Sequence, residues 1–152
     1  MTIEEAVKFV KEAFGSRVDQ GGDFYYNHCI RVMENLPSYV SDDVRHAALL
    51  HDVMEDLGYT ATQLLDAGFS RRTVYLVKQL THDEFRTYEQ YIRELAESGD
   101  RDLIEIKLSD NIDNGDWKRL IKTSEKFQKF ARERYIPARI ILRNALRAWE
   151  NP

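Results

Sequence analysis

The sequence predicts an all-α protein of about eight helices, and three observations carry this prediction. Apolar residues recur at three- and four-residue spacing through most of the chain, as they do along one face of a helix. Only seven glycines and three prolines interrupt 152 residues, and no segment alternates apolar and polar residues between hairpin turns. A chain of this length most often forms one domain with its own core. We therefore expect residues 1–152 to form a single helical domain.

Each expected helix is bounded by capping residues, glycine or proline. The segments span about residues 2–15, 24–36, 41–58, 60–68, 70–80, 87–97, 100–121 and 124–149. The first begins with a capping box of Thr2 and Glu5, and the second stops before Pro37. Serine stands at the N-cap of three of the others, a position that this residue favours: Ser41, Ser70 and Ser124.

The remaining boundaries follow the same signals. Thr60 and Gln63 repeat the capping-box pattern at the start of the fourth helix. Asp100 opens the seventh helix, which we expect to continue to about residue 121. Pro137 lies inside the last helical segment and is expected to break or kink it, because proline lacks the N–H that a helix interior requires.

Composition excludes several classes of protein. No apolar run approaches the roughly 20 residues of a membrane span, and the acidic N-terminus lacks the basic start of a signal peptide. A single cysteine, Cys29, excludes an intrachain disulfide framework and fits a reducing compartment. We therefore expect a cytoplasmic protein that does not associate with membranes.

Charge is unevenly distributed along the chain. From Trp117 to Arg147, ten Lys or Arg residues stand against two acids, a local net charge of +8 that leaves −12 for the remainder. The basic helices over residues 117–149 could meet an anionic substrate, an acidic partner or nucleic acid, or they could present a solvated face. The solvated face is the commoner case, so this charge alone does not predict nucleic-acid binding.

Four ionisable residues stand directly after an apolar helical turn in ALLHDVMED, residues 48–56. They are His51, Asp52, Glu55 and Asp56. Residues four apart lie one above the other on a helix, so the second pair is expected one turn beyond the first. Burying such a set is costly unless a cation compensates its charge. A metal ion is one explanation, and an acidic helix edge that faces water is the other.

Two further segments favour the metal. YYNHCIRV places His28 among aromatic and aliphatic residues, and IEIKLSDNIDN places Asp110 directly after an apolar stretch. Alone, His28 could be a hydrogen-bonded core residue and Asp110 an N-cap or surface residue. Together with the neighbouring pair His51 and Asp52 they give the order H…HD…D. Two imidazoles and two carboxylates suit a six-coordinate ion such as Mn²⁺, Fe²⁺ or Co²⁺.

These motifs resemble those of HD-domain metal-dependent phosphohydrolases, and within that superfamily the Rel/Spo-type hydrolases of (p)ppGpp. YYNHCIRV is similar to the family's Y-x-x-H, AALLHDVMED to its A-L-L-H-D-x-x-E-D, and IKLSDNIDN to its I-K-L-A-D-x-x-x-N. The resemblance covers about residues 5–120 and is to the small stand-alone alarmone hydrolases. It implies an HD-domain helical bundle.

The resemblance also implies a role for each matching residue. The implied ligands of one divalent metal ion, with Mn²⁺ favoured, are His28, His51, Asp52 and Asp110. Glu55 and Asp56 are implied as the catalytic pair that orients and deprotonates the attacking water. Asn114 is implied as a substrate-binding residue that contacts the nucleotide. Arg17 or Lys107 would help to position that nucleotide, although Lys107, one turn before Asp110, could instead pair with an acid.

The function predicted from this resemblance is removal of the 3′-pyrophosphate of a (p)ppGpp-like alarmone, a small-molecule nucleotide, by water that the metal activates. Enzymes with a similar site and another bond to cleave are alternatives: an HD 5′-nucleotidase, a (d)NTP hydrolase or an NADPH phosphatase. A non-catalytic HD module that binds a nucleotide or nucleic acid is a further alternative. The complete Glu55–Asp56 pair argues against that module, because a protein that only binds has no need of it.

Three other features allow more than one interpretation. His46 lies about 140° round the helix from His51 and is expected to point away from the metal. His82 could contact substrate or belong to an exposed loop. Trp117 and several tyrosines stand at helical spacing and could be core residues or stacking platforms for a base.

Overall fold

The computed structural model describes residues 1–151, and its regular elements are helices. Their bounds in chain order are α1 (Ile3–Phe14), α2 (Tyr25–Glu34), α3 (Asp42–Leu50), α4 (Val53–Leu57), α5 (Ala61–Asp66), α6 (Arg71–Leu80), α7 (Tyr88–Ala96), α8 (Arg101–Asn114), α9 (Trp117–Leu120) and α10 (Glu125–Glu150). Within residues 1–151 there is no strand, only an isolated β-bridge between Val18 and Phe24. No helix in this range has both the length and the apolar composition needed to cross a membrane. The all-α class is confirmed, with ten helices where about eight were expected.

The helices begin where the capping residues predict. Thr2 and Glu5 form the expected capping box of α1. Thr60 and Gln63 do the same for α5. The three serines expected as N-caps each accept a hydrogen bond from the backbone three residues on: Ser41, Ser70 and Ser124. Each cap satisfies an N–H that the start of a helix leaves unpaired.

The prediction of one continuous helix over residues 41–58 is wrong, because the chain forms two helices there, α3 and α4. His51 follows the last residue of α3, and its ring Nδ1 lies 2.6 Å from the carbonyl oxygen of Ala48. The backbone N–H of His51 is 3.5 Å from the same oxygen. A side chain that bonds its own backbone competes with the helical hydrogen-bond ladder, so the helix ends at this point.

Two other boundaries differ from prediction. The segment over residues 100–121 divides into α8 and α9 at Gly115, where Arg139 of α10 approaches so closely that a Cβ would lie 2.6 Å from its Nη2. Pro137, expected to break or kink the last helix, lies inside a single α10. The buried side of α10, with Ala138 and Leu142, packs on α8, and this burial offsets the roughly 3 kcal/mol that an interior proline costs.

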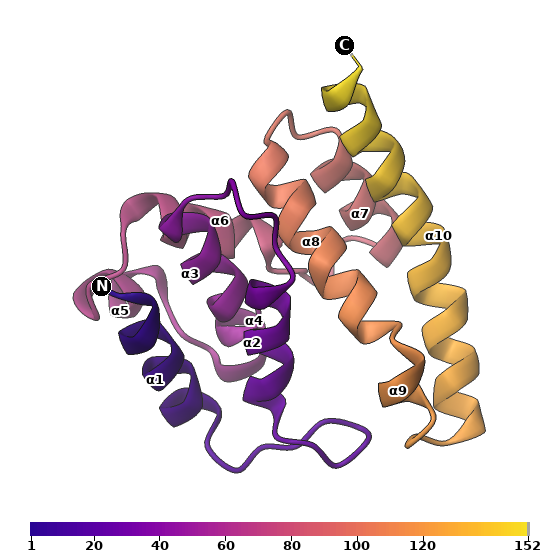
Figure 1. The fold of residues 1–152 in the computed structure, drawn as a ribbon, viewed down its shortest axis with the longest axis horizontal. Helices are drawn as coiled ribbons and strands as arrows, with labels where there is room; N and C mark the ends of the chain where they lie inside the picture. Colours follow the sequence, from indigo (N-terminus) through magenta and orange to yellow (C-terminus); the bar gives the residue numbers. More distant parts are fainter. Residues whose placement is uncertain (152) are drawn as a thin grey trace.

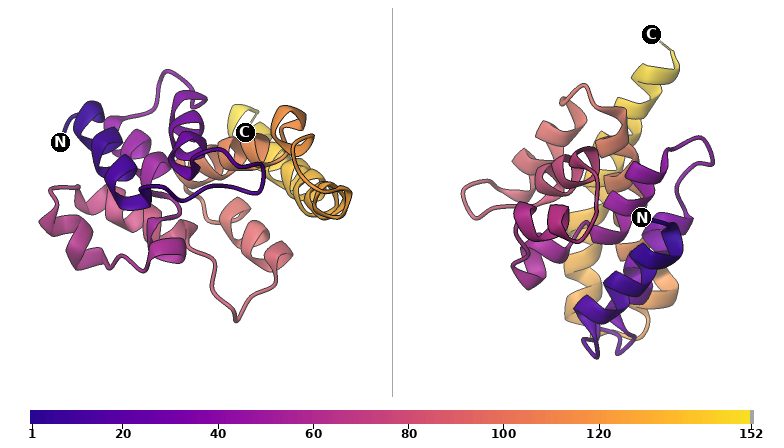
Figure 2. Two further views of the ribbon diagram at one scale, coloured as in Figure 1. Left: turned by 90° about the horizontal axis from the view of Figure 1, so that it is seen from below. Right: turned by 90° about the vertical axis from the view of Figure 1, so that its left-hand side faces the viewer.

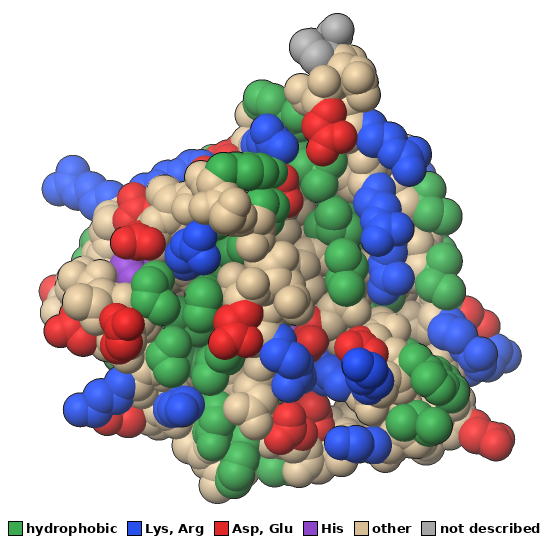
Figure 3. Space-filling model, viewed as in Figure 1, with side chains coloured by type: hydrophobic (Ala, Val, Ile, Leu, Met, Phe, Trp, Pro, Cys, Tyr) green, Lys and Arg blue, Asp and Glu red, His purple; other side chains and the backbone are tan. Residues whose placement is uncertain are grey.

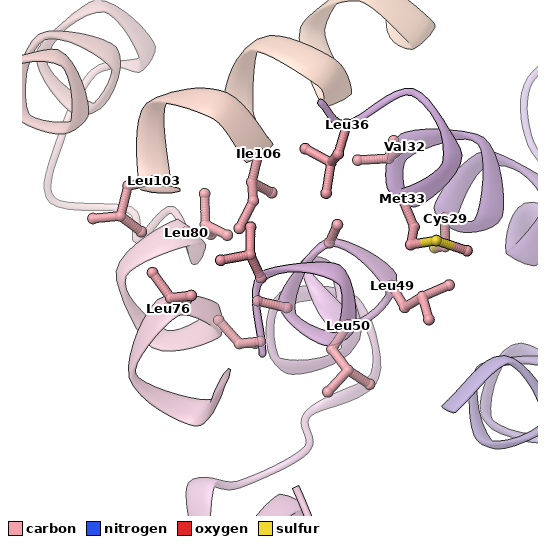
Figure 4. Close-up of a cluster of buried hydrophobic side chains, with 14 of the residues drawn as sticks. Cys29, Val32, Met33, Leu36, Leu49, Leu50, Leu76, Leu80, Leu103 and Ile106 are labelled. Carbon is pink, nitrogen blue, oxygen red and sulfur yellow. The ribbon is translucent and has the colours of Figure 1, made fainter. Parts of the chain in front are cut away.

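Helix α3 lies at the centre of the N-terminal half and packs against α1, α2, α6 and α8 (Figure 1). Leu49 and Leu50 of α3 are fully buried and meet apolar side chains from α2, α6 and α8, among them Cys29, Leu76 and Ile106 (Figure 4). On its other side, α8 is covered by α10 and α7, as all three views show (Figures 1 and 2). Helix α8 therefore belongs to both halves of the molecule, and residues on it can meet partners from each.

Candidate metal centre

Four side chains from three separate parts of the chain converge on one point. They are His28 of α2, His51 and Asp52 between α3 and α4, and Asp110 of α8. One ligand atom of each lies within 4.8 Å of all the others. The structure thus brings together the four residues that the sequence motifs single out as ligands.

The break between α3 and α4 explains how two consecutive residues face the same point. On a continuous helix, consecutive side chains diverge by about 100°. Asp52 instead has backbone angles of φ −105° and ψ −1°, which depart from regular helical values. Its Oδ2 lies 2.9 Å from Nε2 of His51. The interrupted helix is therefore part of how the site is built.

The spacing of the four groups fits a common ion. Nε2 of His28 and Nε2 of His51 lie 3.2 Å apart. Asp110 Oδ1 lies 3.1 Å from the first and 3.2 Å from the second. Ligands bound at about 2.0–2.2 Å to one ion stand roughly 3 Å from each other. The three distances among His28, His51 and Asp110 match that requirement, while Asp52 Oδ2 lies 3.8 Å from Nε2 of His28.

The tautomers of the two histidines also favour a bound metal ion. His51 Nδ1 faces the carbonyl oxygen of Ala48 at 2.6 Å, and His28 Nδ1 faces Asp113 Oδ2 at 2.6 Å. Neither oxygen can donate, so each neutral ring carries its proton on Nδ1 and has a lone pair on Nε2. Two buried lone pairs and two carboxylates then face one another, an arrangement that a cation stabilises. The donor set therefore fits a divalent metal ion.

Local charges keep both carboxylates ionised. Burial opposes the charge of Asp52, yet in the metal-free protein the positive charge of a protonated His51, whose place a bound cation would take, lowers the pKa of this carboxyl to about 2. Burial likewise opposes the charge of Asp110, but Lys107 and the two imidazoles hold the pKa of Asp110 well below its usual range. Both side chains are thus available as anionic oxygen ligands at neutral pH.

Lys107 pairs with an acid, one of the two roles that the sequence left open. Its Nζ lies 2.7 Å from Asp110 Oδ2 and 5.1 Å from the ring centroid of Tyr91. The side chain is only 12% exposed. It also borders the small pocket beside the metal ligands. Lys107 therefore holds Asp110 in place and also lines the small pocket.

The acidic pair of α4 borders that same small pocket of about 150 Å³. Glu55 accepts a hydrogen bond from the backbone N–H of His82 at 2.6 Å. Asp56 is half-buried, and this burial together with the charge of Asp52 raises the pKa of its carboxyl to about 6. A carboxylate with a pKa near neutrality is suited to accept and return a proton.

A larger pocket of about 460 Å³ adjoins the small one. Both are lined by Tyr25, Asp56, Asn114 and Tyr135. Arg17, predicted as a substrate-binding residue, lines the larger pocket, and its Nη1 donates to the backbone carbonyl of Asp56 at 3.1 Å. Asn114 donates to Asp110 Oδ1 at 2.8 Å. The three residues predicted to bind substrate therefore line two adjoining pockets, together called the hollow, with Lys107 in the small one.

Several residues of this hollow were not singled out from the sequence. Tyr25 donates to Asp52 Oδ2 at 2.6 Å, and burial raises the pKa of its hydroxyl, which stays protonated. Arg134 places its guanidinium 3.9 Å from the ring centroid of Tyr88 and borders the small pocket. Tyr25 belongs to the Y-x-x-H motif and could have been found there. Arg134 could not, because nothing in a basic helix shows which base faces inward.

The basic C-terminal region divides into two sets of side chains. One set is exposed on α10 and includes Arg132, Arg143 and Arg147. Figure 3 shows a row of basic side chains along this helix. The other set turns inward and includes Arg119 and Arg134, which line the two pockets. This region therefore has a solvated face, one of the alternatives posed for it, and it also has basic side chains that line the pockets.

The remaining sequence features also have definite places. His46 is 4% exposed and packs edge-on against Phe69, away from the metal ligands as expected. His82 is half-buried, stacks on Tyr91 and borders the small pocket. Trp117 is 53% exposed and lines neither pocket of the hollow.

Comparison with known proteins identifies the fold. No protein-family model and no curated protein matches the chain. Among solved structures the chain is similar to one described as a metazoan ortholog of SpoT that hydrolyzes ppGpp and plays a role in starvation responses. The TM-score is 0.72 at 20% sequence identity, over 96% of this chain and 94% of that one. The chain therefore shares the all-α fold of that protein.

Proposed function

We propose that this protein is a metal-dependent phosphohydrolase that acts on a nucleotide, and that it removes the 3′-pyrophosphate of a (p)ppGpp-like alarmone. One observation carries the proposal. Four metal-ligand atoms lie within 4.8 Å of one another, and the Glu55–Asp56 pair borders the same pocket. The similarity in fold to a ppGpp-hydrolysing protein supports the choice of alarmone.

His28, His51, Asp52 and Asp110 would hold the ion, for which Mn²⁺ is our preferred candidate. A divalent ion supplies two things when bound: a lower pKa for water and neutralisation of charge on phosphoryl oxygens. Nitrogen and oxygen donors without thiolate suit such an ion.

Asp56 is the proposed proton acceptor. It lies in the pocket with a pKa of about 6, raised by burial and by Asp52, so it is ionised at neutral pH and can still be protonated during a reaction. Glu55 would orient the attacking water, and the backbone N–H of His82 fixes the direction of its carboxylate. Tyr25 keeps Asp52 in place through its 2.6 Å hydrogen bond.

The substrate would lie along the hollow with its phosphates at the small end. Lys107 and Arg134 provide positive charge there, and Nε of Arg134 has no hydrogen-bond partner among residues 1–151. The larger pocket, lined by Arg17, Asn114 and Tyr135, would take the nucleoside. A nucleotide can thus reach the acidic pair and the metal ligands together.

We further propose that residues 1–152 form one domain and that the protein acts in the cytoplasm. Helix α8 joins the two halves through its packing on α3 and on α10, which supports a single domain. The one cysteine, Cys29, is buried and unpaired, as is typical of a reducing compartment.

The test is a nucleotide panel with purified protein, stripped of metal and reloaded with Mn²⁺. We expect pyrophosphate to be released from (p)ppGpp. Orthophosphate released only from ordinary nucleotides would contradict the alarmone and favour a 5′-nucleotidase or phosphatase. No turnover by a metal-loaded protein that binds RNA with steep salt dependence would favour the non-catalytic module.

A pair of matched variants separates loss of metal from loss of fold. His51→Gln removes a proposed ligand, whereas His46→Gln removes a histidine that is buried to a similar degree but packs against Phe69. We expect only the first to abolish turnover and metal retention. Equal loss in both variants would count against the assigned site.

A further inference from the structure

A second layer of charged side chains lies behind His28, on the side away from the ligand cluster. Its centre is Asp113 of α8, which is 3% exposed. Asp113 contacts His28, Arg31 and Arg119, and the sequence motifs assign it no role. We propose that Asp113 is a positioning residue that fixes the proton and the orientation of His28, an inference that rests on the proposed metal site.

The contact between Asp113 and His28 determines where the ring proton lies. Oδ2 of Asp113 is 2.6 Å from Nδ1 of His28, and an ionised carboxylate only accepts hydrogen bonds. Nη1 of Arg119 lies 3.2 Å from the same Nδ1, but it is closer to Asp113 Oδ2, at 2.8 Å. Of the two contacts to Nδ1, the one with Asp113 is shorter. It therefore holds the proton on Nδ1 and leaves the lone pair of Nε2 for the metal.

The two arginines fix the carboxylate itself. Nε of Arg31 lies 2.8 Å from Asp113 Oδ1, and Nη2 of Arg31 lies 3.2 Å from Oδ2, so the guanidinium binds both oxygens. Arg119 adds its own contact to Oδ2. A carboxylate held by two guanidinium groups keeps its charge and cannot rotate. Both properties are needed if Asp113 is to hold the His28 ring in one orientation.

Helix spacing places Asp113 and Asp110 on opposite edges of the same imidazole. They are three residues apart on α8, so they lie on one face of that helix. Asp110 Oδ1 is 3.1 Å from Nε2 of His28, while Asp113 Oδ2 is 2.6 Å from Nδ1. One helix therefore supplies both a metal ligand and the support of a second ligand.

The same layer reaches the wall of the larger pocket. Nη2 of Arg119 donates to Asp19 Oδ2 at 2.9 Å. The other oxygen of Asp19 accepts the backbone N–H groups of Gly21 and Asp23, which closes the loop that lines this pocket. Asp113 and Arg119 thus connect His28 to the loop that lines the larger pocket.

The first measurement needs no variant and no metal. Long-range proton–nitrogen NMR distinguishes the two tautomers of a histidine, and the chain has only four histidines to assign. Where the spectra of the metal-free protein show a neutral His28 ring, we expect that ring to carry its proton on Nδ1. A proton on Nε2 would overturn the proposal.

The second measurement is Mn²⁺ affinity by calorimetry for Asp113→Asn. We expect about 10–100-fold weaker binding, because support of a ligand by such a partner is typically worth that factor. The matched control is Glu105→Gln, which removes another buried acid of α8 whose partners are Tyr39 and Arg101. We expect the control to bind Mn²⁺ as the unaltered protein does.

The outcomes are distinct from those of the nucleotide assay. Unchanged Mn²⁺ affinity in a folded Asp113→Asn variant would overturn the positioning role, even if the protein hydrolyses alarmones. The expected tautomer and the weakened affinity would stand even if no nucleotide were turned over, and then only the proposed reaction would fail. Should Asp113→Asn not fold, the tautomer of the unaltered protein still decides.

Discussion

Charged residues gather in two regions of this molecule, and the two regions differ in burial. On the outer side of α10, the side chains of Lys129 and Glu133 are 73% and 68% exposed and lie 3.8 Å apart. At the metal centre, the side chains of His28 and Asp110 are 1% and 4% exposed and lie 3.1 Å apart. Water solvates the first pair, which contributes little. The second pair is buried from solvent, so its charge needs a partner.

This difference shows what separates a site from a charged surface. The basic region over residues 117–149 is the more conspicuous feature of the sequence, with its local charge of +8. The metal centre involves few residues, scattered over three segments. Burial and convergence, rather than the density of charge along the chain, mark the place where chemistry can occur.

The largest expected effect is loss of the bound metal, which we expect from a substitution at the metal centre and not from one on α10. Asp110→Asn removes a buried ligand and leaves Lys107 without its partner, so we expect loss of the bound metal and of turnover. Glu133→Gln on α10 removes an exposed acid and should alter neither. Metal per chain, measured by mass spectrometry after dialysis, checks both variants. One Mn²⁺ per chain in Asp110→Asn would contradict the assignment.

The next largest effect is a lower kcat in a variant that still binds the metal. Asp56→Asn removes the proposed proton acceptor and keeps all four ligands, so we expect kcat to fall by about 10²–10⁴-fold. Calorimetry should show an unchanged affinity for Mn²⁺. A variant that keeps normal kcat would transfer the role of proton acceptor to Glu55 or to another group.

The pH dependence of turnover follows from the same carboxyl. Burial and the charge of Asp52 raise the pKa of Asp56 to about 6. The ionised form is the proposed base, so kcat should fall as the pH drops below about 6 and level off above it. A pH–rate profile tests this, and the acid limb should remain in Glu55→Gln. An unaltered profile down to pH 4.5, which is about 1.5 units lower, would contradict the assignment.

A smaller effect concerns stability in acid. Although burial opposes its charge, hydrogen bonds from His28 and Arg31 lower the pKa of Asp113 to about 2. The unfolded chain takes up this proton at higher pH, so the ionised carboxyl adds stability above about pH 4 that is lost as the pH falls toward 2. The difference in unfolding free energy between the unaltered protein and Asp113→Asn should therefore shrink by about 2 kcal/mol over that interval. Urea denaturation at several pH values measures it, and a constant difference would contradict the assigned ion pairs.

The smallest effect is expected on the outer side of α10. Arg132→Ala and Arg143→Ala replace exposed bases, and we expect changes in unfolding free energy within about 0.5 kcal/mol and no change in kcat. Arg134→Ala, on the same helix but facing the small pocket, should instead raise KM for the nucleotide. Equal effects at all three positions would remove the distinction between the two sides of α10.

Sequence reasoning predicted most of the helices and singled out four residues that the structure brings together, and it missed features that depend on packing. Spacing and capping predicted the helix starts, and the motifs singled out His28 and Asp110 although more than 80 residues separate them. The sequence did not predict that the helix would end before His51, because this end depends on a ring nitrogen of His51 bonding to the backbone of Ala48. The position of Asp113 behind His28 was missed because no local pattern shows which nitrogen of an imidazole will face which helix.

The most direct test of the central claim is anomalous diffraction from crystals grown with Mn²⁺. The account predicts a single strong peak within coordination distance of Nε2 of His28 and His51 and of the carboxylates of Asp52 and Asp110. Crystals in which that position holds no anomalous density, while Mn²⁺ binds elsewhere on the protein, would contradict it.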